Sequence, residues 1–204
     1  MYTPKHFQIT DDQEAIAFMQ KYSFATIVTV ANGLPTATHL PFIVEQRDGQ
    51  IVLVSHFAKA NHQAADVFDC IPLVIFTEPH AYISPKYYEK ELNVPTWNYI
   101  AVHAYGKANL IDGPEQVTAV LEKMIGFYEA QYMQQWNKLP ADFKSKMMNG
   151  IVAFEIIVDD LQGKKKLSQN KTRAEQQNII KSFSTSSDSN EQQIAAYMVA
   201  NKTV

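Results

Sequence analysis

The stretch Phe24-Ala25-Thr26-Ile27-Val28-Thr29-Val30-Ala31-Asn32-Gly33 decides the fold of this chain. The run up to Ala31 is rich in the β-branched residues that favour strands. Asn-Gly after such a run is the strongest short signal for a two-residue hairpin. A partner strand is therefore expected over residues 36–44, and Arg47-Asp48-Gly49 supplies the next turn before a third strand over residues 50–56. The sequence predicts an antiparallel meander.

Short strands and helices follow one another irregularly along the rest of the chain, without the βαβ rhythm of a doubly wound sheet. Further strands are expected over residues 71–76, 81–84, 98–110 and 151–158, and helices over residues 12–22, 59–66, 113–128, 140–149 and 191–200. The pattern predicts an α+β fold, a mainly antiparallel barrel with peripheral helices. A polar linker over residues 182–190 separates the last helix, so the expected domains are residues 1–181 and a tail over residues 182–204.

The composition indicates in which cellular compartment the protein is expected and which classes of partner it favours. The 204 residues are 46% hydrophobic, which is enough for a core, and no apolar run approaches the roughly 20 residues that span a bilayer. The start of the chain has no apolar segment typical of a signal peptide, and Cys70 is the only cysteine. We therefore expect a cytoplasmic protein. The net charge of −3 creates no general attraction for nucleic acid.

Two segments carry side chains suited to a phosphorylated aromatic ligand. Ser55, His56, Lys59 and Asn61 gather a hydroxyl, an imidazole, an ammonium and an amide between a strand and a helix, which suits a phosphate. The alternative is a polar strand–helix junction. The loop around Trp97-Asn98-Tyr99 places two aromatic rings beside an amide and can frame a flat heteroaromatic ligand. The alternative is that both rings anchor the core.

A third segment, Gly163-Lys164-Lys165-Lys166-Leu167-Ser168-Gln169-Asn170, places three lysines before three hydrogen-bonding side chains. A lysine run is usually a solvated turn, but the three hydrogen-bonding side chains that follow it indicate a contact with a ligand. Glycine-rich nucleotide loops are absent, and the six histidines lack the spacings of metal sites. We therefore expect no metal, and the sequence identifies no catalytic residue.

Several motifs, taken in order, resemble the PaiB family of FMN-binding negative transcriptional regulators. The matching stretches cover roughly residues 1–180 and include Thr38-His39-Leu40-Pro41-Phe42, His56-Phe57-Ala58-Lys59-Ala60-Asn61, Val94-Pro95-Thr96-Trp97-Asn98-Tyr99 and Gly163 through Asn170. The resemblance implies an FMN-binding split barrel, related to pyridoxamine-phosphate oxidases and flavin reductases, that assembles as a homodimer with the flavin at the subunit interface.

The resemblance also implies roles for individual residues. The strand at Thr38, His39 and Leu40 would run beside the flavin ring. The phosphate would be held by Ser55, His56, Lys59 and Asn61. The ring or ribityl chain would be bordered by Trp97, Asn98 and Tyr99. A loop with Lys166, Ser168 and Gln169 would close the site.

Three functions remain open at this point. The first is a flavin-binding repressor of transcription, which the resemblance implies. The sequence contains no helix-turn-helix, and its only basic cluster (Lys164, Lys165, Lys166, Lys171 and Arg173) overlaps the proposed flavin loop, which argues against direct DNA binding. The second is an FMN-dependent reductase or oxidase. The third is a haem-binding split barrel that uses His56, His103 or a residue of the C-terminal tail.

Overall fold

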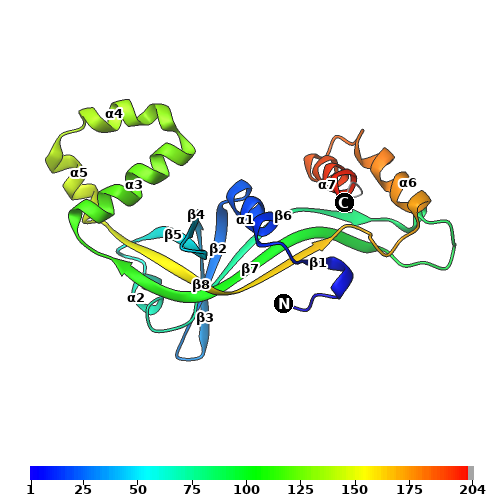
Figure 1. Ribbon diagram of the computed structural model, residues 1–204, viewed down its shortest axis with the longest axis horizontal. Helices are drawn as coiled ribbons and strands as arrows, with labels where there is room; N and C mark the ends of the chain where they lie inside the picture. Colours follow the sequence, from blue (N-terminus) through cyan, green and yellow to red (C-terminus); the bar gives the residue numbers. More distant parts are fainter. Residues whose placement is uncertain (202–204) are drawn as a thin grey trace. The chain divides into compact units, whose positions relative to one another are not determined.

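A computed structural model describes residues 1–201 of the chain. Within these residues, no helix combines the length and the apolar character needed to cross a membrane. The elements follow one another (Figure 1) in the order η1 (Lys5–Phe7), β1 (Gln8–Ile9), α1 (Asp12–Lys21), β2 (Phe24–Ala31), β3 (Leu34–Pro41), β4 (Ile43–Arg47), β5 (Gln50–Ala58), α2 (Gln63–Asp66), β6 (Leu73–Ile83), η2 (Pro85–Tyr87), β7 (Thr96–Ile111), α3 (Pro114–Tyr128), η3 (Ala130–Tyr132), α4 (Met133–Lys138), α5 (Ala141–Met148), β8 (Ile151–Lys166), α6 (Arg173–Phe183) and α7 (Ser189–Ala200).

The chain divides into two compact units. Unit 1 contains Met1–Ala15, Thr77–Val102 and the chain from Gln162 onward. Unit 2 contains Ile16–Phe76 and His103–Leu161. Because β6, β7 and β8 each continue along the chain from one unit into the other, each unit is built on a part of the same three strands.

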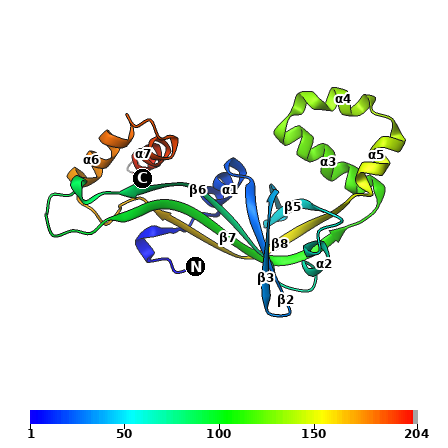
Figure 2. The same ribbon diagram turned by 180° about the vertical axis from the view of Figure 1, so that it is seen from behind.

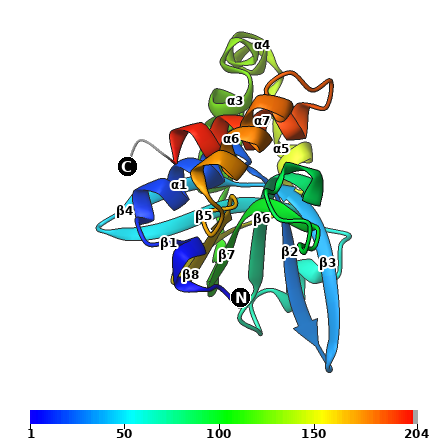
Figure 3. The ribbon, with the colours of Figure 1, turned by 90° about the vertical axis from the view of Figure 1, so that its right-hand side faces the viewer.

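The antiparallel strands of unit 2 form the barrel, in the hydrogen-bonded order β3-β2-β6-β7-β8-β5-β4. The β2–β3 hairpin (Figure 3) pairs Phe24 with Pro41 and continues to its turn at Asn32 and Gly33. Both turn residues have positive φ, 52° and 76°, as a type I′ turn requires. The turn between β4 and β5 has the same signature at Asp48 and Gly49. Both predicted hairpin turns are thus present.

The predicted continuous strand over residues 36–44 is wrong, because the chain leaves one hairpin and enters the other at Phe42. β3 pairs with β2 and β4 pairs with β5, at opposite ends of the strand order, so the segment does not form a simple meander. Phe42 is fully buried, and its N–H donates to the carbonyl of Ser23 at 2.8 Å. Its ring packs edge-on against Phe76 and Phe154. Core packing of this one ring therefore fixes the break.

A helical excursion, α3 to α5, connects β7 to β8 in unit 2 (Figure 1). Pro114 occupies the first turn of α3, a position where its missing N–H is harmless. The buried side chains of Val120 and Met124 pack against Ile43, Val52, Val54 and Ala153. The amphipathic face predicted for α3 therefore covers the barrel at β4, β5 and β8.

Unit 1 is a small sheet with helices against it. β1 pairs with the end of β8, where Ile9 lies opposite Gly163. A Cβ on that glycine would lie 2.6 Å from the Ile9 Cβ, so glycine is needed for the close approach. α6 and α7 lie on one side of the β6–β7 hairpin, and the N-terminal segment lies on the other (Figure 2). The buried apolar residues on these two helices are Ile179, Phe183, Ile194, Ala195 and Met198.

Several element boundaries differ from the sequence-based expectation. The strands predicted over residues 71–76 and 81–84 are one strand, β6, which contains Pro79. β8 extends to Lys166 instead of ending at residue 158, because it pairs with β1. α6 runs across the predicted domain boundary at residue 181, and α7 begins at Ser189. The assignment of residues 1–181 and 182–204 as separate domains stays a prediction.

Candidate functional site

Ser55 lies on β5 with its side chain turned into the core of unit 2. It is completely buried, and its hydroxyl donates to the carbonyl of Pro41 at 2.7 Å. Strand alternation places the neighbouring His56 on the other face of β5. The predicted phosphate donors Ser55 and His56 are therefore not brought together.

Thr38 and Asn61 are brought together by Gln63, a residue that the sequence analysis did not single out. The Asn61 amide donates to the Thr38 hydroxyl at 3.0 Å, and that hydroxyl donates to the Gln63 carbonyl oxygen at 2.6 Å. Gln63 is fully buried, and its amide nitrogen also donates to the carbonyls of Ile27 and Thr36. These bonds tie the start of α2 to the β2–β3 hairpin. A buried glutamine gives no periodic signal in the sequence, which explains why it was missed.

His39 and Leu40 point to opposite sides of β3. His39 is exposed, and its Nδ1 lies 2.8 Å from the hydroxyl of Thr26 on β2, whereas Leu40 is half-buried. The edge strand β3 thus presents His39 outward and Leu40 inward.

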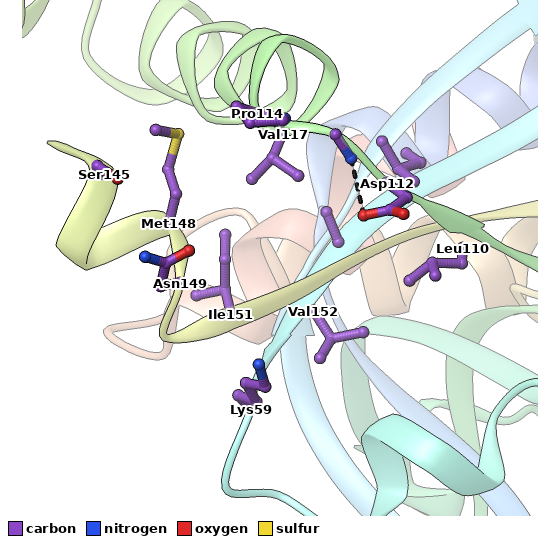
Figure 4. Close-up of a pocket in the computed structure, with 13 residues that line it drawn as sticks. Lys59, Leu110, Asp112, Pro114, Val117, Ser145, Met148, Asn149, Ile151 and Val152 are labelled. Atoms are coloured by element: carbon purple, nitrogen blue, oxygen red, sulfur yellow. Dashed lines mark hydrogen bonds between the residues drawn. The ribbon is translucent and has the colours of Figure 1, made fainter.

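Lys59 is the available cation of the predicted phosphate group. Its backbone N–H donates to the carbonyl of Gly150 at 2.8 Å, which fixes the chain at the end of β5. Its side chain is exposed, and within residues 1–201 its ammonium has no hydrogen-bond or ion-pair partner. Figure 4 shows it at the edge of a pocket of about 380 Å³ beside Asn149 and Ile151. Asp112 lines the same pocket but accepts a hydrogen bond from the Gly113 N–H at 2.8 Å.

His56 lines a different, mostly apolar pocket of about 410 Å³. The other lining residues are Pro41, Met124, Ile125, Tyr128, Glu129 and Tyr132. Burial lowers the pKa of His56, and its Nδ1 is buried without a hydrogen-bond partner among the described residues. A neutral imidazole in an apolar pocket is poorly suited to a doubly charged phosphate. Of the predicted phosphate group, Lys59 therefore has the chemistry that fits best.

In unit 1, Trp97, Asn98 and Tyr99 alternate across β7. Asn98 is fully buried, accepts from the Ser168 hydroxyl at 3.1 Å and donates to the Met198 sulfur at 3.7 Å. The indole of Trp97 is 51% exposed, and Tyr99 is half-buried. Asn98 is thus a packing residue, whereas the two rings share the opposite face. The predicted aromatic pair is preserved, but the amide between them points elsewhere.

The face with these two rings carries further aromatic side chains and one lysine. The rings of His80 and Tyr82 lie 6.0 Å and 5.9 Å from that of Trp97. The Lys164 ammonium lies 5.1 Å from the Tyr99 ring centre, within the range of a cation–π contact. Lys164 was not among the predicted site residues. Side-chain alternation along β8 places Lys164 on this face. The sequence did not indicate this position because the strand was predicted to end at residue 158.

Lys166 is the last residue of β8, and Ser168 and Gln169 lie in the ordered turn that follows it. Lys166 is a strand residue, not a loop residue as expected, and its ammonium donates to the Thr96 hydroxyl. Burial, followed by the charge of Lys164, lowers the pKa of Lys166. Ser168 has a positive φ of 61°, and the Gln169 side chain closes the turn by accepting from the Leu167 N–H.

The four lysines of this basic cluster are all engaged within unit 1. Their partners are the Tyr2 carbonyl for Lys164, Glu14 for Lys165, Thr96 for Lys166 and Asn93 for Lys171. These four lysines are therefore bonded inside the protein, whereas Arg173, the fifth member of the cluster, is exposed.

Comparison with known proteins identifies the family. Residues 1–160 match the family described as "Putative FMN-binding domain". The protease synthase and sporulation protein PAI 2 of Bacillus subtilis is 40% identical over 202 residues, which cover 97% of this chain and 96% of that protein. A protein of Emericella nidulans is 30% identical over 186 residues, covering 72% of this chain and 74% of its own.

Solved structures show the same fold at low identity. The flavocytochrome Anf3 from Azotobacter vinelandii superposes with a TM-score of 0.65 at 14% identity, covering 81% of this chain and 72% of that one. The FAD and heme binding protein from Mycobacterium smegmatis gives 0.62 at 14% identity, with 78% and 73% covered. The predicted split-barrel fold is thereby confirmed, and the family match confirms FMN as the predicted cofactor. This chain belongs to the FMN-binding split-barrel family that includes PAI 2.

Proposed function

We propose that this chain binds FMN and that the phosphate is held by Lys59. The observation that carries the proposal is the Lys59 ammonium, which has no partner within residues 1–201 and stands at a pocket edge on the barrel. A phosphate with up to two negative charges requires such a cation. Lysine offers a point charge, without the two-pronged geometry of arginine.

A separate surface that we propose for a flavin ring is the aromatic face of unit 1. Trp97 and Tyr99 offer flat surfaces that suit an isoalloxazine ring, and Lys164 adds positive charge beside them. When bound, FMN supplies redox chemistry that amino-acid side chains lack. The residues of the chain bind and orient the ring.

The remaining predicted contacts are assigned supporting roles in the proposal. Most of their polar groups are already bonded inside the protein, so they would position the binding residues or approach FMN through their remaining surfaces. They are Thr38, His39, Leu40, Ser55, His56, Asn61, Asn98, Lys166, Ser168 and Gln169.

We also propose that the protein is a homodimeric, flavin-dependent regulator of transcription that acts without contacting DNA through its basic cluster. Resemblance to PaiB-type regulators supports the regulatory role. The internal partners of Lys164, Lys165, Lys166 and Lys171 argue against a DNA-binding role for these four lysines, since phosphate contacts need cations at the surface.

FMN titration of the flavin-free protein, followed by flavin fluorescence, tests the cofactor site. We expect Lys59→Gln to weaken FMN binding by about tenfold or more, which corresponds to roughly 1.4 kcal/mol. Lys107→Gln, which removes an exposed lysine on β7, is the matched control and should bind as the wild type does. Equal affinities for the wild type and Lys59→Gln would exclude Lys59 as the phosphate ligand.

Three further measurements test the regulatory proposal. Analytical ultracentrifugation should give the mass of a dimer, and gel-shift assays at low salt should show no binding to DNA. Deleting the gene should change transcript levels, which the wild type restores and Lys59→Gln does not. Unchanged transcript levels after the deletion would exclude the regulatory role.

A separate experiment tests the alternative enzyme function. Anaerobic bleaching of the bound flavin by a nicotinamide donor would favour a reductase.

A further inference from the structure

A small pocket in unit 1 lies between the start of β7, the end of β8 and the turn that follows β8. Its volume is about 190 Å³. All of its lining residues belong to unit 1: Phe7, Tyr88, Val94, Pro95, Thr96, Asn98, Lys166, Ser168, Asn170 and Lys171.

Among residues 1–201, two ammonium groups and no carboxylate line this pocket. Lys166 and Lys171 each donate to a neutral oxygen, on Thr96 and Asn93 respectively. The Lys171 ammonium also lies 3.7 Å from the ring centre of Tyr88. Two carboxylates lie nearby without lining the pocket. That of Glu175 is buried and accepts from the N–H groups of Glu89 and Thr172, and that of Glu89 accepts from the Thr172 hydroxyl at 3.2 Å. Lys166 and Lys171 are the charged groups among the described residues that line the pocket itself, and they make it favourable to an anion.

The walls and the size of the pocket restrict which anion fits. Phe7, Val94 and Pro95 add apolar surface to the cationic and amide groups, so the pocket suits a ligand with a short apolar body and one charged end. A volume of about 190 Å³ corresponds to about six waters at ~30 Å³ each. Sites for drug-sized ligands span roughly 300–1,000 Å³, so the pocket is too small for a flavin ring.

Tyr88 is the lining residue whose hydroxyl the protein leaves unpaired. The residue is 9% exposed, and its Oη is buried without a hydrogen-bond partner among the described residues. Burial, and secondly the charge of Glu175, raises the pKa of Tyr88, so the hydroxyl keeps its proton and can donate. A buried hydroxyl without a partner is destabilising, and such groups in native proteins call for an explanation.

We propose that this pocket binds a small organic monocarboxylate, a substrate or effector distinct from FMN. The carboxylate pairs with Lys166 and Lys171, and the short apolar body lies against Phe7, Val94 and Pro95. The inference goes beyond the proposed flavin site, but Asn98, Lys166 and Ser168 of the pocket are also supporting residues of that proposal. Its test therefore uses Lys171 and Tyr88, which are outside the proposed FMN contacts.

Calorimetric titration of the full-length protein with butyrate at constant ionic strength tests this site. Saturable binding is expected, and the neutral analogue butyramide should not bind. Lys171→Gln should weaken butyrate binding by about tenfold, because it removes a charge-assisted contact. Lys181→Gln, which changes an exposed lysine on α6, should leave the affinity unchanged.

Tyr88→Phe provides a second variant that does not depend on charge. Removing an unpaired buried hydroxyl should leave the thermal midpoint of the ligand-free protein unchanged or raised. It should also weaken butyrate binding if the hydroxyl donates to the ligand. Equal affinity in wild type, Lys171→Gln and Tyr88→Phe would overturn the proposal.

Two further outcomes would also count against the carboxylate site. Inorganic phosphate binding as tightly as butyrate would exclude the role of the apolar walls. An equal loss of FMN affinity in Lys171→Gln would show that the pocket belongs to the flavin site. FMN binding that is retained in Lys171→Gln but lost in Lys59→Gln separates the two proposals.

Discussion

At the residue scale, Gly106 permits two strands of the barrel to approach more closely than any other residue type allows. A Cβ at this position would lie 1.9 Å from the carbonyl oxygen of Ile157 on β8. The obstacle is backbone, so it cannot move aside by a rotamer change. Gly126 on α3 provides the contrast, since a Cβ there meets nothing within 4 Å.

We therefore expect Gly106→Ala to lower the free energy of unfolding by about 3 kcal/mol or more, or to prevent folding. Gly126→Ala should raise it by about 0.5–1 kcal/mol, because alanine favours the helix interior. Urea denaturation of both variants measures the difference. Similar stabilities for the two would contradict the close approach of β7 and β8.

His56 gives stability a pH dependence at the same scale. Burial lowers its pKa in the folded protein, so the unfolded chain binds a proton at a higher pH than the folded chain does. Stability should therefore fall as the pH drops through 6.5, the ordinary pKa of a histidine, towards the lowered pKa of the folded protein. His103, whose pKa burial also lowers, contributes in the same direction.

We expect His56→Gln to flatten the loss of stability between about pH 7 and pH 5, because glutamine does not titrate. His62→Gln, at an exposed position, should retain the slope of the wild type. Thermal midpoints across this pH range provide the measurement. An unchanged slope in His56→Gln would show that this histidine is not protonated on unfolding.

At the element scale, α6 begins with a complete capping box. The Thr172 hydroxyl accepts from the Glu175 N–H at 3.2 Å, and the Glu175 carboxylate accepts from the Thr172 N–H at 3.1 Å. These bonds satisfy N–H groups that the first turn of a helix leaves without partners. The cap fixes where the turn after β8 ends and where α6 starts.

Thr172→Ala should therefore reduce the free energy of unfolding by about 1 kcal/mol, a typical loss for a helix cap. Thr172→Ser keeps the hydroxyl and should restore most of that stability. Chemical denaturation followed by circular dichroism distinguishes the two variants. If serine destabilises as much as alanine, the hydroxyl is not the stabilising group.

At the scale of the whole molecule, FMN binding should increase the stability of the folded protein by mass action. A ligand that binds only the folded protein stabilises it by about 2.7 kcal/mol at a hundredfold excess over its dissociation constant. FMN should therefore raise the thermal midpoint of the wild-type protein in a concentration-dependent manner. Lys59→Gln should show a smaller rise at each FMN concentration, while Lys107→Gln should follow the wild type. A rise that is identical in all three proteins would contradict the assignment of Lys59.

The sequence by itself determined the features that depend on local chemistry. The turns at Asn32-Gly33 and Asp48-Gly49 need positive φ, and the amphipathic α3 needs only its own periodicity, so all three were predicted. The ordered motifs also indicated the family and its cofactor. The tertiary structure alone decided the break at Phe42, the extension of β8 to Lys166 and the burial of Asn98. Each of these depends on partners distant in the sequence, Phe154, Gln8 and Ser168, and no local pattern reports such a partner.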